Sequence, residues 1–90
     1  MEILLKDQYV LKFYNISREN SFFQIFDSIT NNIVFDHNCL PEDLTTEYVK
    51  SFLQSEIDEV TGLSNLVTKQ ADINFCSSQL KNLQFCLDLF

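Results

Sequence analysis

Aromatic and β-branched residues fill the first half of the chain and largely determine the fold that it can adopt. They crowd three segments, residues 9–16, 21–29 and 33–35. Such residues fit the pleated, half-buried surface of a strand. Residues 30–32 read Thr-Asn-Asn, and asparagine tolerates the left-handed backbone of a tight turn. We therefore predict a hairpin over residues 21–36 within a three-stranded antiparallel meander, to which residues 2–5 add a short strand or the start of the first.

The middle of the chain has the spacing of a helix. Apolar residues recur three or four positions apart, at Leu44, Tyr48, Val49, Phe52, Leu53, Ile57 and Val60. Pro41 fits a first helical position, two acids follow at the positive end of the helix dipole, and Thr45 or Thr46 suits an N-cap. Gly62 is a natural stop. These signals predict one main helix over about residues 42–60.

The last twenty residues fit two patterns. A helix would place four apolar residues on one stripe, at Leu80, Leu83, Leu87 and Phe90. A strand would alternate other residues with Leu83, Phe85, Leu87 and Leu89. Because a three-stranded sheet needs further partners, we expect strands over about residues 71–79 and 83–90, with a helix as the alternative.

No feature divides the chain into parts. One glycine and one proline interrupt its 90 residues, and there is neither a linker nor an internal repeat. Nine phenylalanines and three tyrosines supply the bulk of a core. We predict a single small globular domain over residues 1–90. Its fold class is α+β, with an antiparallel sheet of about four to five strands and the one main helix packed on one face.

Several features indicate a cytoplasmic protein. The first residues carry an acid at position 2 and a short apolar run, which is unlike a signal peptide. The sequence contains no apolar stretch of the ~20 residues that span a bilayer. Cys39, Cys76 and Cys86 are odd in number and lack paired short spacing, which argues against a secreted disulfide scaffold. We expect a soluble protein in a reducing compartment, with no membrane partner.

The net charge of −7 is concentrated in the middle of the chain. Nine acids and one base, Lys50, lie between residues 19 and 68. Such a field favours basic partners and speeds their encounter. Direct nucleic-acid binding is disfavoured because the six scattered Lys and Arg residues form no basic cluster. Glycine-rich phosphate-binding loops are excluded by the single glycine.

Residues 36–39, Asp-His-Asn-Cys, are the only stretch where potentially reactive side chains gather. His37 and Cys39 lack the short paired spacing of structural zinc sites, so we expect no metal and no cofactor. A cysteine nucleophile would need His37 within hydrogen-bond reach and a third group to orient it. A turn or a helix entry accounts more simply for this stretch. We expect no catalytic residue and no enzymatic activity.

The predicted helix carries an unusual combination of residues on one flank. Projection at ~100° per residue places Tyr48 and Phe52 beside the apolar face, and Glu56 and Glu59 share that flank. With Asp58, these glutamates would occupy the last turn, where the helix dipole favours cations. The simpler interpretation is that Phe52 belongs to the core and that the acids face water. Our hypothesis is that the cluster meets a basic partner through Tyr48, Phe52, Glu56, Asp58 and Glu59.

The sequence thus favours a small acidic, non-catalytic binding protein. We expect it to engage a basic surface of another protein, such as a nucleic-acid-binding protein, and to inhibit or neutralise it. Immunity proteins, inhibitors and anti-restriction factors share this size and acidity, although no motif links the chain to them. The alternative is a subunit of a homo-oligomeric structural or chaperone-like assembly, in which an edge strand or the aromatic sheet face is buried in a homodimer.

Overall fold

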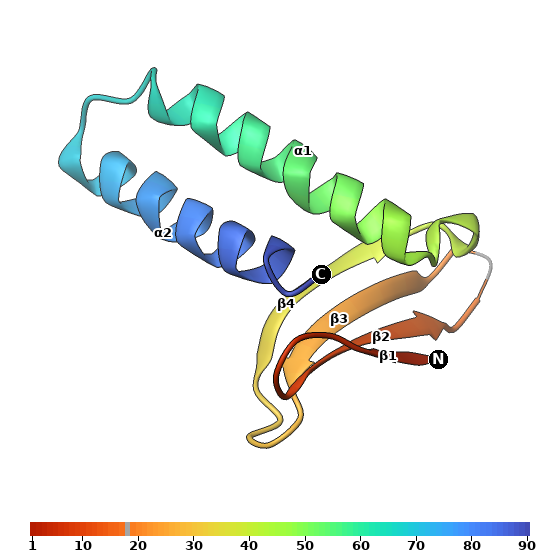
Figure 1. Ribbon diagram of the computed structural model, residues 1–90. Coiled ribbons are helices and arrows are strands. Elements are labelled where there is room, and N and C mark those ends of the chain that lie inside the picture. The colour runs from red at the N-terminus through yellow and green to blue at the C-terminus, as the bar shows by residue number, and fades with distance from the viewer. Residues whose placement is uncertain (18) are drawn as a thin grey trace.

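A computed structural model describes residues 1–17 and 19–90 of the chain. The elements follow one another as β1 (Glu2–Leu4), β2 (Tyr9–Asn15), β3 (Ser21–Asp27), β4 (Ile33–Cys39), a single 3₁₀ turn η1 (Pro41–Asp43), α1 (Thr46–Ser64) and α2 (Gln70–Leu87). The four strands and two helices make an α+β fold, as predicted (Figure 1). Neither helix combines the length and the apolar character needed to cross a bilayer.

The strands form an antiparallel meander in the order β1-β2-β3-β4. The predicted hairpin over residues 21–36 is confirmed, with β3 and β4 joined by a tight turn. Asn31 takes the left-handed backbone at φ 64°, and the Asp27 carboxylate accepts hydrogen bonds from the backbone N–H groups of Ile29 at 2.9 Å and Thr30 at 3.3 Å. These bonds hold the pKa of Asp27 below its ordinary value, the contact with Ile29 being the largest cause.

The predicted main helix exists, but its end differs from the prediction. Thr45 is the N-cap, and its hydroxyl accepts the backbone N–H of Tyr48 at 3.1 Å. The helix then runs past Gly62 to Ser64. Gly62 does not adopt a positive φ, so it does not terminate the helix in the left-handed manner of a glycine cap. The helix ends instead at Asn65, where the chain turns through a bond from the N–H of Leu66 to the carbonyl of Leu63.

The strands expected over residues 71–79 and 83–90 are wrong, because residues 70–87 form α2. The apolar stripe of a helix, rather than the alternation of a strand, matches the residues that are buried in this segment. Leu83 and Cys86, three positions apart, are both buried, whereas the strand pattern would have put Cys86 on the opposite face from Leu83. The four-stranded sheet needs no further strands, because both helices pack over its inner face and bury the apolar residues there.

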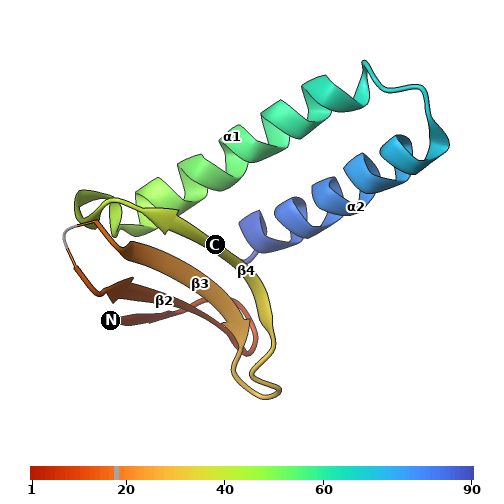
Figure 2. The same ribbon diagram turned by 180° about the vertical axis from the view of Figure 1, so that it is seen from behind.

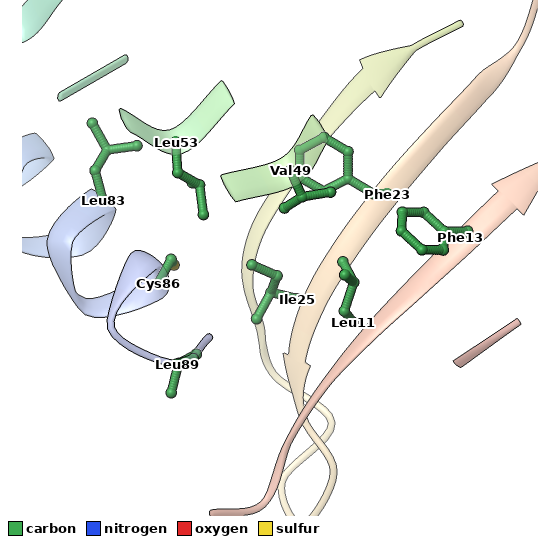
Figure 3. Packing of buried hydrophobic residues seen from close by; sticks show 9 residues of the cluster. All are labelled: Leu11, Phe13, Phe23, Ile25, Val49, Leu53, Leu83, Cys86 and Leu89. Carbon is green, nitrogen blue, oxygen red and sulfur yellow. The ribbon is translucent and has the colours of Figure 1, made fainter. Parts of the chain in front are cut away.

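The core lies between the inner face of the sheet and the two helices (Figure 3). It consists of nine buried residues, Leu11, Phe13, Phe23, Ile25, Val49, Leu53, Leu83, Cys86 and Leu89. β2 and β3 contribute alternate residues, as expected for strands with one face on the core. The C-terminal end of the chain reaches the first loop, where the N–H of Lys6 donates to the carbonyl of Leu89 at 3.2 Å.

α1 and α2 form an antiparallel helical hairpin of which only one half lies over the sheet. Figures 1 and 2 show both helices on the same side of the sheet, with their connection far from it. Toward the sheet, Phe52 of α1 lies beside Phe35 and His37, and Asn82 of α2 bonds to Val34. We call residues 55–75 the distal hairpin. In this segment the two helices pack against one another and overhang the edge strand β4.

Candidate protein-binding surface

The two aromatic residues of the predicted flank are half-buried against the sheet. The ring of Phe52 lies 5.9 Å from that of Phe23, 6.2 Å from that of Phe35 and 4.3 Å from that of His37, measured between centroids. Tyr48 lies 6.1 Å from Phe52 at the start of the same flank. Phe52 therefore fastens α1 to β4, and much of its surface is used within the fold.

The hydroxyl of Tyr48 is held in its neutral form. Partial burial raises the pKa of Tyr48, and the charge of Asp43, together with that of Cys39 once its thiol ionises, raises this pKa further. A neutral hydroxyl beside an apolar ring can donate a hydrogen bond to a partner while the ring packs. This part of the flank is therefore polar at one point and otherwise apolar.

The three predicted acids occupy two different sides of α1. Glu56 and Glu59 lie four and seven residues after Phe52, so they continue its side of the helix away from the sheet. Glu56 is half-buried and Glu59 is exposed. Asp58 lies on the water-facing side, where the Gln54 side-chain amide donates to its carboxylate at 3.0 Å. The structure thus brings Glu56 and Glu59 together with Phe52 and separates Asp58 from them.

The expectation that these acids crowd the last turn of the helix is wrong, because α1 continues to Ser64. The last turn holds neither an acid nor a base. The unfavourable dipole effect is confined to the terminal turn, so it bears little on Glu56 and Asp58. The three acids are instead distinguished by their position on the distal hairpin, where acidic residues outnumber basic ones.

Two exposed apolar residues of the distal hairpin lie on the sides of their helices that continue toward the sheet. Leu63 follows Phe52 by eleven residues, or three turns, so it lies on the same side of α1. Phe75 precedes Asn82 by seven residues, or two turns, and shares its side of α2. The side-chain amide of Asn82 donates to the Val34 carbonyl of β4 at 3.1 Å, so this side of α2 faces the sheet.

Leu63 and Phe75 therefore project from the sheet side of the hairpin, beyond the point where the sheet ends. They are 50% and 65% exposed. We call Glu56, Glu59, Leu63 and Phe75 the hairpin underside. Neither apolar member was predicted from the sequence. A helical interpretation of the last twenty residues would have put Phe75 off the stripe that Leu80, Leu83 and Leu87 define, and so outside the core, but would not have placed it on this surface.

The charge of the distal hairpin is strongly negative. Its ionisable residues are four acids and one base, namely Glu56, Asp58, Glu59, Asp72 and Lys69. None of the hydrogen bonds in the described part of the chain joins Glu56 or Glu59 to a base. A surface with apolar centres and an uncompensated acidic rim is complementary to an apolar surface with a basic rim.

The stretch Asp36-His37-Asn38-Cys39 is divided by the pleat of β4. Asp36 and Asn38 point to the outer face of the sheet, and His37 and Cys39 to the inner face, in register with Phe23 and Ser21. One ring nitrogen of His37, Nδ1, lies 2.7 Å from the Asn38 carbonyl oxygen. Burial, followed by the charge of Asp43, raises the pKa of Cys39, which is opposite to what a nucleophilic thiol needs.

The remaining cysteines are buried in α2. Burial raises the pKa of Cys86 to about 11, so this thiol is protonated and inert at neutral pH. Cys76 is also buried, and all three cysteines are free thiols. Among residues 1–17 and 19–90, no group of three or more His, Cys, Asp or Glu side chains is placed to hold a metal ion.

Comparisons with protein-family models, with curated proteins and with solved structures found no match to this chain. The surface has therefore to be interpreted from its own chemistry.

Proposed function

We propose that this chain is a small acidic, non-catalytic binding protein that covers a basic surface of another protein and thereby inhibits or neutralises it. The observation that carries the proposal is the hairpin underside. Leu63 and Phe75 are exposed beside Glu56 and Glu59 on a segment whose acids exceed its bases by three. Exposed apolar side chains of this size cost solvation free energy, which contact with a partner would recover.

The residues of this interface have different roles. Leu63 and Phe75 supply apolar anchors, because buried aromatic and aliphatic side chains account for most binding free energy. Glu56 and Glu59 set the rate of encounter and the choice of a basic partner. Asp58 contributes to the long-range field from the other side of α1. Phe52 and Tyr48 fix the position of α1 on β4, and Tyr48 adds the exposed part of its ring and its hydroxyl.

The fitting partner has a shallow apolar surface bordered by Lys or Arg side chains. A protein whose basic surface binds nucleic acid has this character, since phosphate contacts require such residues. When the acidic hairpin occupies that surface, the phosphate backbone is excluded by both volume and charge. Inhibition then requires no chemistry from this chain.

The test is retention of a partner by the immobilised protein across a salt series. The wild type is compared with a variant that carries Glu56→Gln, Asp58→Asn and Glu59→Gln. A matched control carries Glu19→Gln, Glu42→Gln and Glu47→Gln, which remove the same charge from other exposed positions. We expect the first variant to release the partner at lower salt than the control does, because screening already weakens the remaining attraction when the Debye length falls from ~10 Å at 0.1 M to ~3 Å at 1 M.

The apolar anchors are tested on the purified complex. Leu63→Ala with Phe75→Ala should weaken the equilibrium binding by roughly a hundredfold, in line with two anchors of about 1–2 kcal/mol each. The control is Ile29→Ala, which truncates a still more exposed apolar side chain, at 75%, in the β3–β4 turn. If the charge variant and its control lose the partner equally, net charge rather than the hairpin governs binding, and the proposal is wrong.

A further inference from the structure

The outer face of the sheet is apolar although both helices lie on the other side. Alternation along the strands places six apolar residues there, Leu4, Val10, Tyr14, Phe22, Phe26 and Ile33. An antiparallel sheet with one solvated face normally alternates apolar with polar residues. No other element of residues 1–17 and 19–90 packs against this face (Figures 1 and 2).

The aromatic part of this face is ordered and accessible. The rings of Tyr14 and Phe22 are stacked, with centroids 4.4 Å apart and planes 8° from parallel. Lys12 Nζ lies 5.0 Å from the centroid of the Tyr14 ring. Ile33 is 54% exposed and Leu4 is 74% exposed. A shallow hollow on this face is lined by Lys12, Tyr14, Gln24, Phe26, Asn31 and Ile33.

Except for Asn38, the polar residues of the face lie in a single row. Lys12 of β2 pairs with Gln24 of β3, and Gln24 pairs with Asp36 of β4. The row therefore runs base, amide, acid across three adjacent strands. Consider a second copy turned by 180° about an axis that runs along β3, between the two sheets. Its Asp36 would then lie opposite Lys12 of the first copy, and its Lys12 opposite Asp36 of the first copy. The row is complementary to itself under this operation.

The apolar residues agree with the same symmetry axis. Phe22 and Phe26 flank Gln24 on β3, so each would meet its own counterpart across the axis. Glu2, which pairs with Lys12 from β1, would lie beyond the edge of the partner's β4 and remain in water. Sheets that pack face to face keep their strands within about 30° of one another, which this axis allows.

From this self-complementary face we propose that two copies of the chain associate back to back through the outer faces of their sheets, with Lys12 of each copy opposite Asp36 of the other. The inference is independent of the proposed function, which uses the distal hairpin. The strand residues of this face carry one base and two acids, a far smaller excess than the −7 of the whole chain. Repulsion between identical chains is therefore small here, whereas two distal hairpins would repel.

The size of the face sets the strength of the dimer. β2, β3 and β4 have seven residues each, at ~3.3 Å per residue and ~4.8 Å apart, so the three strands that overlap in the dimer give a face of about 23 by 14 Å. The planar area is about 330 Å² per copy, or about 660 Å² for both, before the relief of the side chains is added. Stable interfaces bury roughly 1,200–2,000 Å² in total. We therefore expect a weak, reversible dimer with a Kd of the order of 100 µM.

Sedimentation equilibrium of the purified full chain, over roughly 1 µM to 1 mM, tests the dimer. The wild type should pass from monomer to dimer within this range. Lys12→Glu and Asp36→Lys should each weaken association by roughly tenfold or more, because each places like charges opposite one another twice per dimer. The variant that carries both substitutions should associate like the wild type, and an equal mixture of the two single variants should form the mixed dimer.

Matched controls distinguish this row from net charge. Lys50→Glu and Asp58→Lys make the same changes on exposed positions of α1 and should leave association unchanged. A wild type that is monomeric throughout would overturn the proposal. So would single variants that associate normally, a double variant that does not recover, or α1 controls that weaken association as much. Circular dichroism establishes that each variant is folded, which these exposed or half-exposed positions should permit.

Discussion

The ring of His37 packs on the ring of Phe52 at 4.3 Å between centroids, and this contact joins the edge strand β4 to α1. Phe23 and Phe35 complete the aromatic cluster around Phe52. The contacts explain why α1 begins over the sheet and keeps a defined direction as it leaves it. Glu56, Glu59 and Leu63 owe their positions to this attachment.

Phe52→Ala should destabilise the protein by about 2–3 kcal/mol. The value is below the usual 3–5 kcal/mol for a fully buried phenylalanine because the side chain is half-buried. Urea denaturation followed by circular dichroism measures the change. Phe75→Ala is the control, since the same truncation at a residue that is 65% exposed should cost under about 0.5 kcal/mol. Equal losses at the two positions would mean that Phe52 does not anchor α1.

Thr45→Ala should cost about 1 kcal/mol, because its hydroxyl is the N-cap that accepts the Tyr48 N–H. Thr46→Ala is the matched control, since this residue already lies within the helix and makes no capping bond. The two free energies of unfolding are compared under identical conditions. A larger loss at Thr46 would place the start of α1 one residue later than described.

Gly62→Ala should stabilise the protein by roughly 0.5–1 kcal/mol. Gly62 lies inside α1, its φ is not positive, and a Cβ at this position would meet no atom within 4 Å. Alanine then lowers the conformational entropy of the unfolded chain without strain. An increase in the midpoint of thermal unfolding is the expected observation. A decrease would show that Gly62 takes a conformation reserved for glycine.

The stability of the protein should fall as the pH rises toward 11, in part because of Cys86. Burial raises the pKa of this thiol to about 11 in the folded chain, so the folded state retains a proton that the unfolded state has already lost. Stability from this group is complete below the unfolded pKa and is lost between that value and about 11. Denaturant titrations from neutral to alkaline pH measure the slope. Cys86→Ala should be less stable at neutral pH but should lose stability less steeply above it, and an unchanged slope would contradict the assignment.

The sheet and α1 could be predicted because their signals are local. Strand residues 21–36 alternate around an Asn-rich turn, and the spacing of Val49, Leu53 and Ile57 is compatible only with a helix. The C-terminal region could not be assigned in this way, because Leu83 and Leu87 belong equally to a helical stripe and to a strand alternation. The choice is made by packing of that stripe on α1, which is a tertiary interaction.

Only part of the binding surface could be predicted, because some of its residues follow from local geometry and others depend on tertiary structure. The shared flank of Phe52, Glu56 and Glu59 follows from helical geometry alone. Leu63 and Phe75 could not be assigned to a surface, since their exposure depends on how far the hairpin overhangs the sheet and on the end of α1 at Ser64 rather than near residue 60. Composition likewise showed that aromatic residues abound, but not that Tyr14, Phe22 and Phe26 share the outer face.

Every strand of this sheet pairs with its neighbour in the sequence, and the two helices are also consecutive. Such a topology requires only short loops to close, so the chain should fold rapidly, by successive hairpins, without waiting for distant segments to meet. The contacts between the sheet and α2 are exceptions, because they join segments far apart in the sequence, among them the bond from Lys6 to Leu89 and the contact of the Tyr9 and Phe85 rings at 5.2 Å between centroids. We expect these contacts to form after the hairpins and to join the local structures into one cooperative unit.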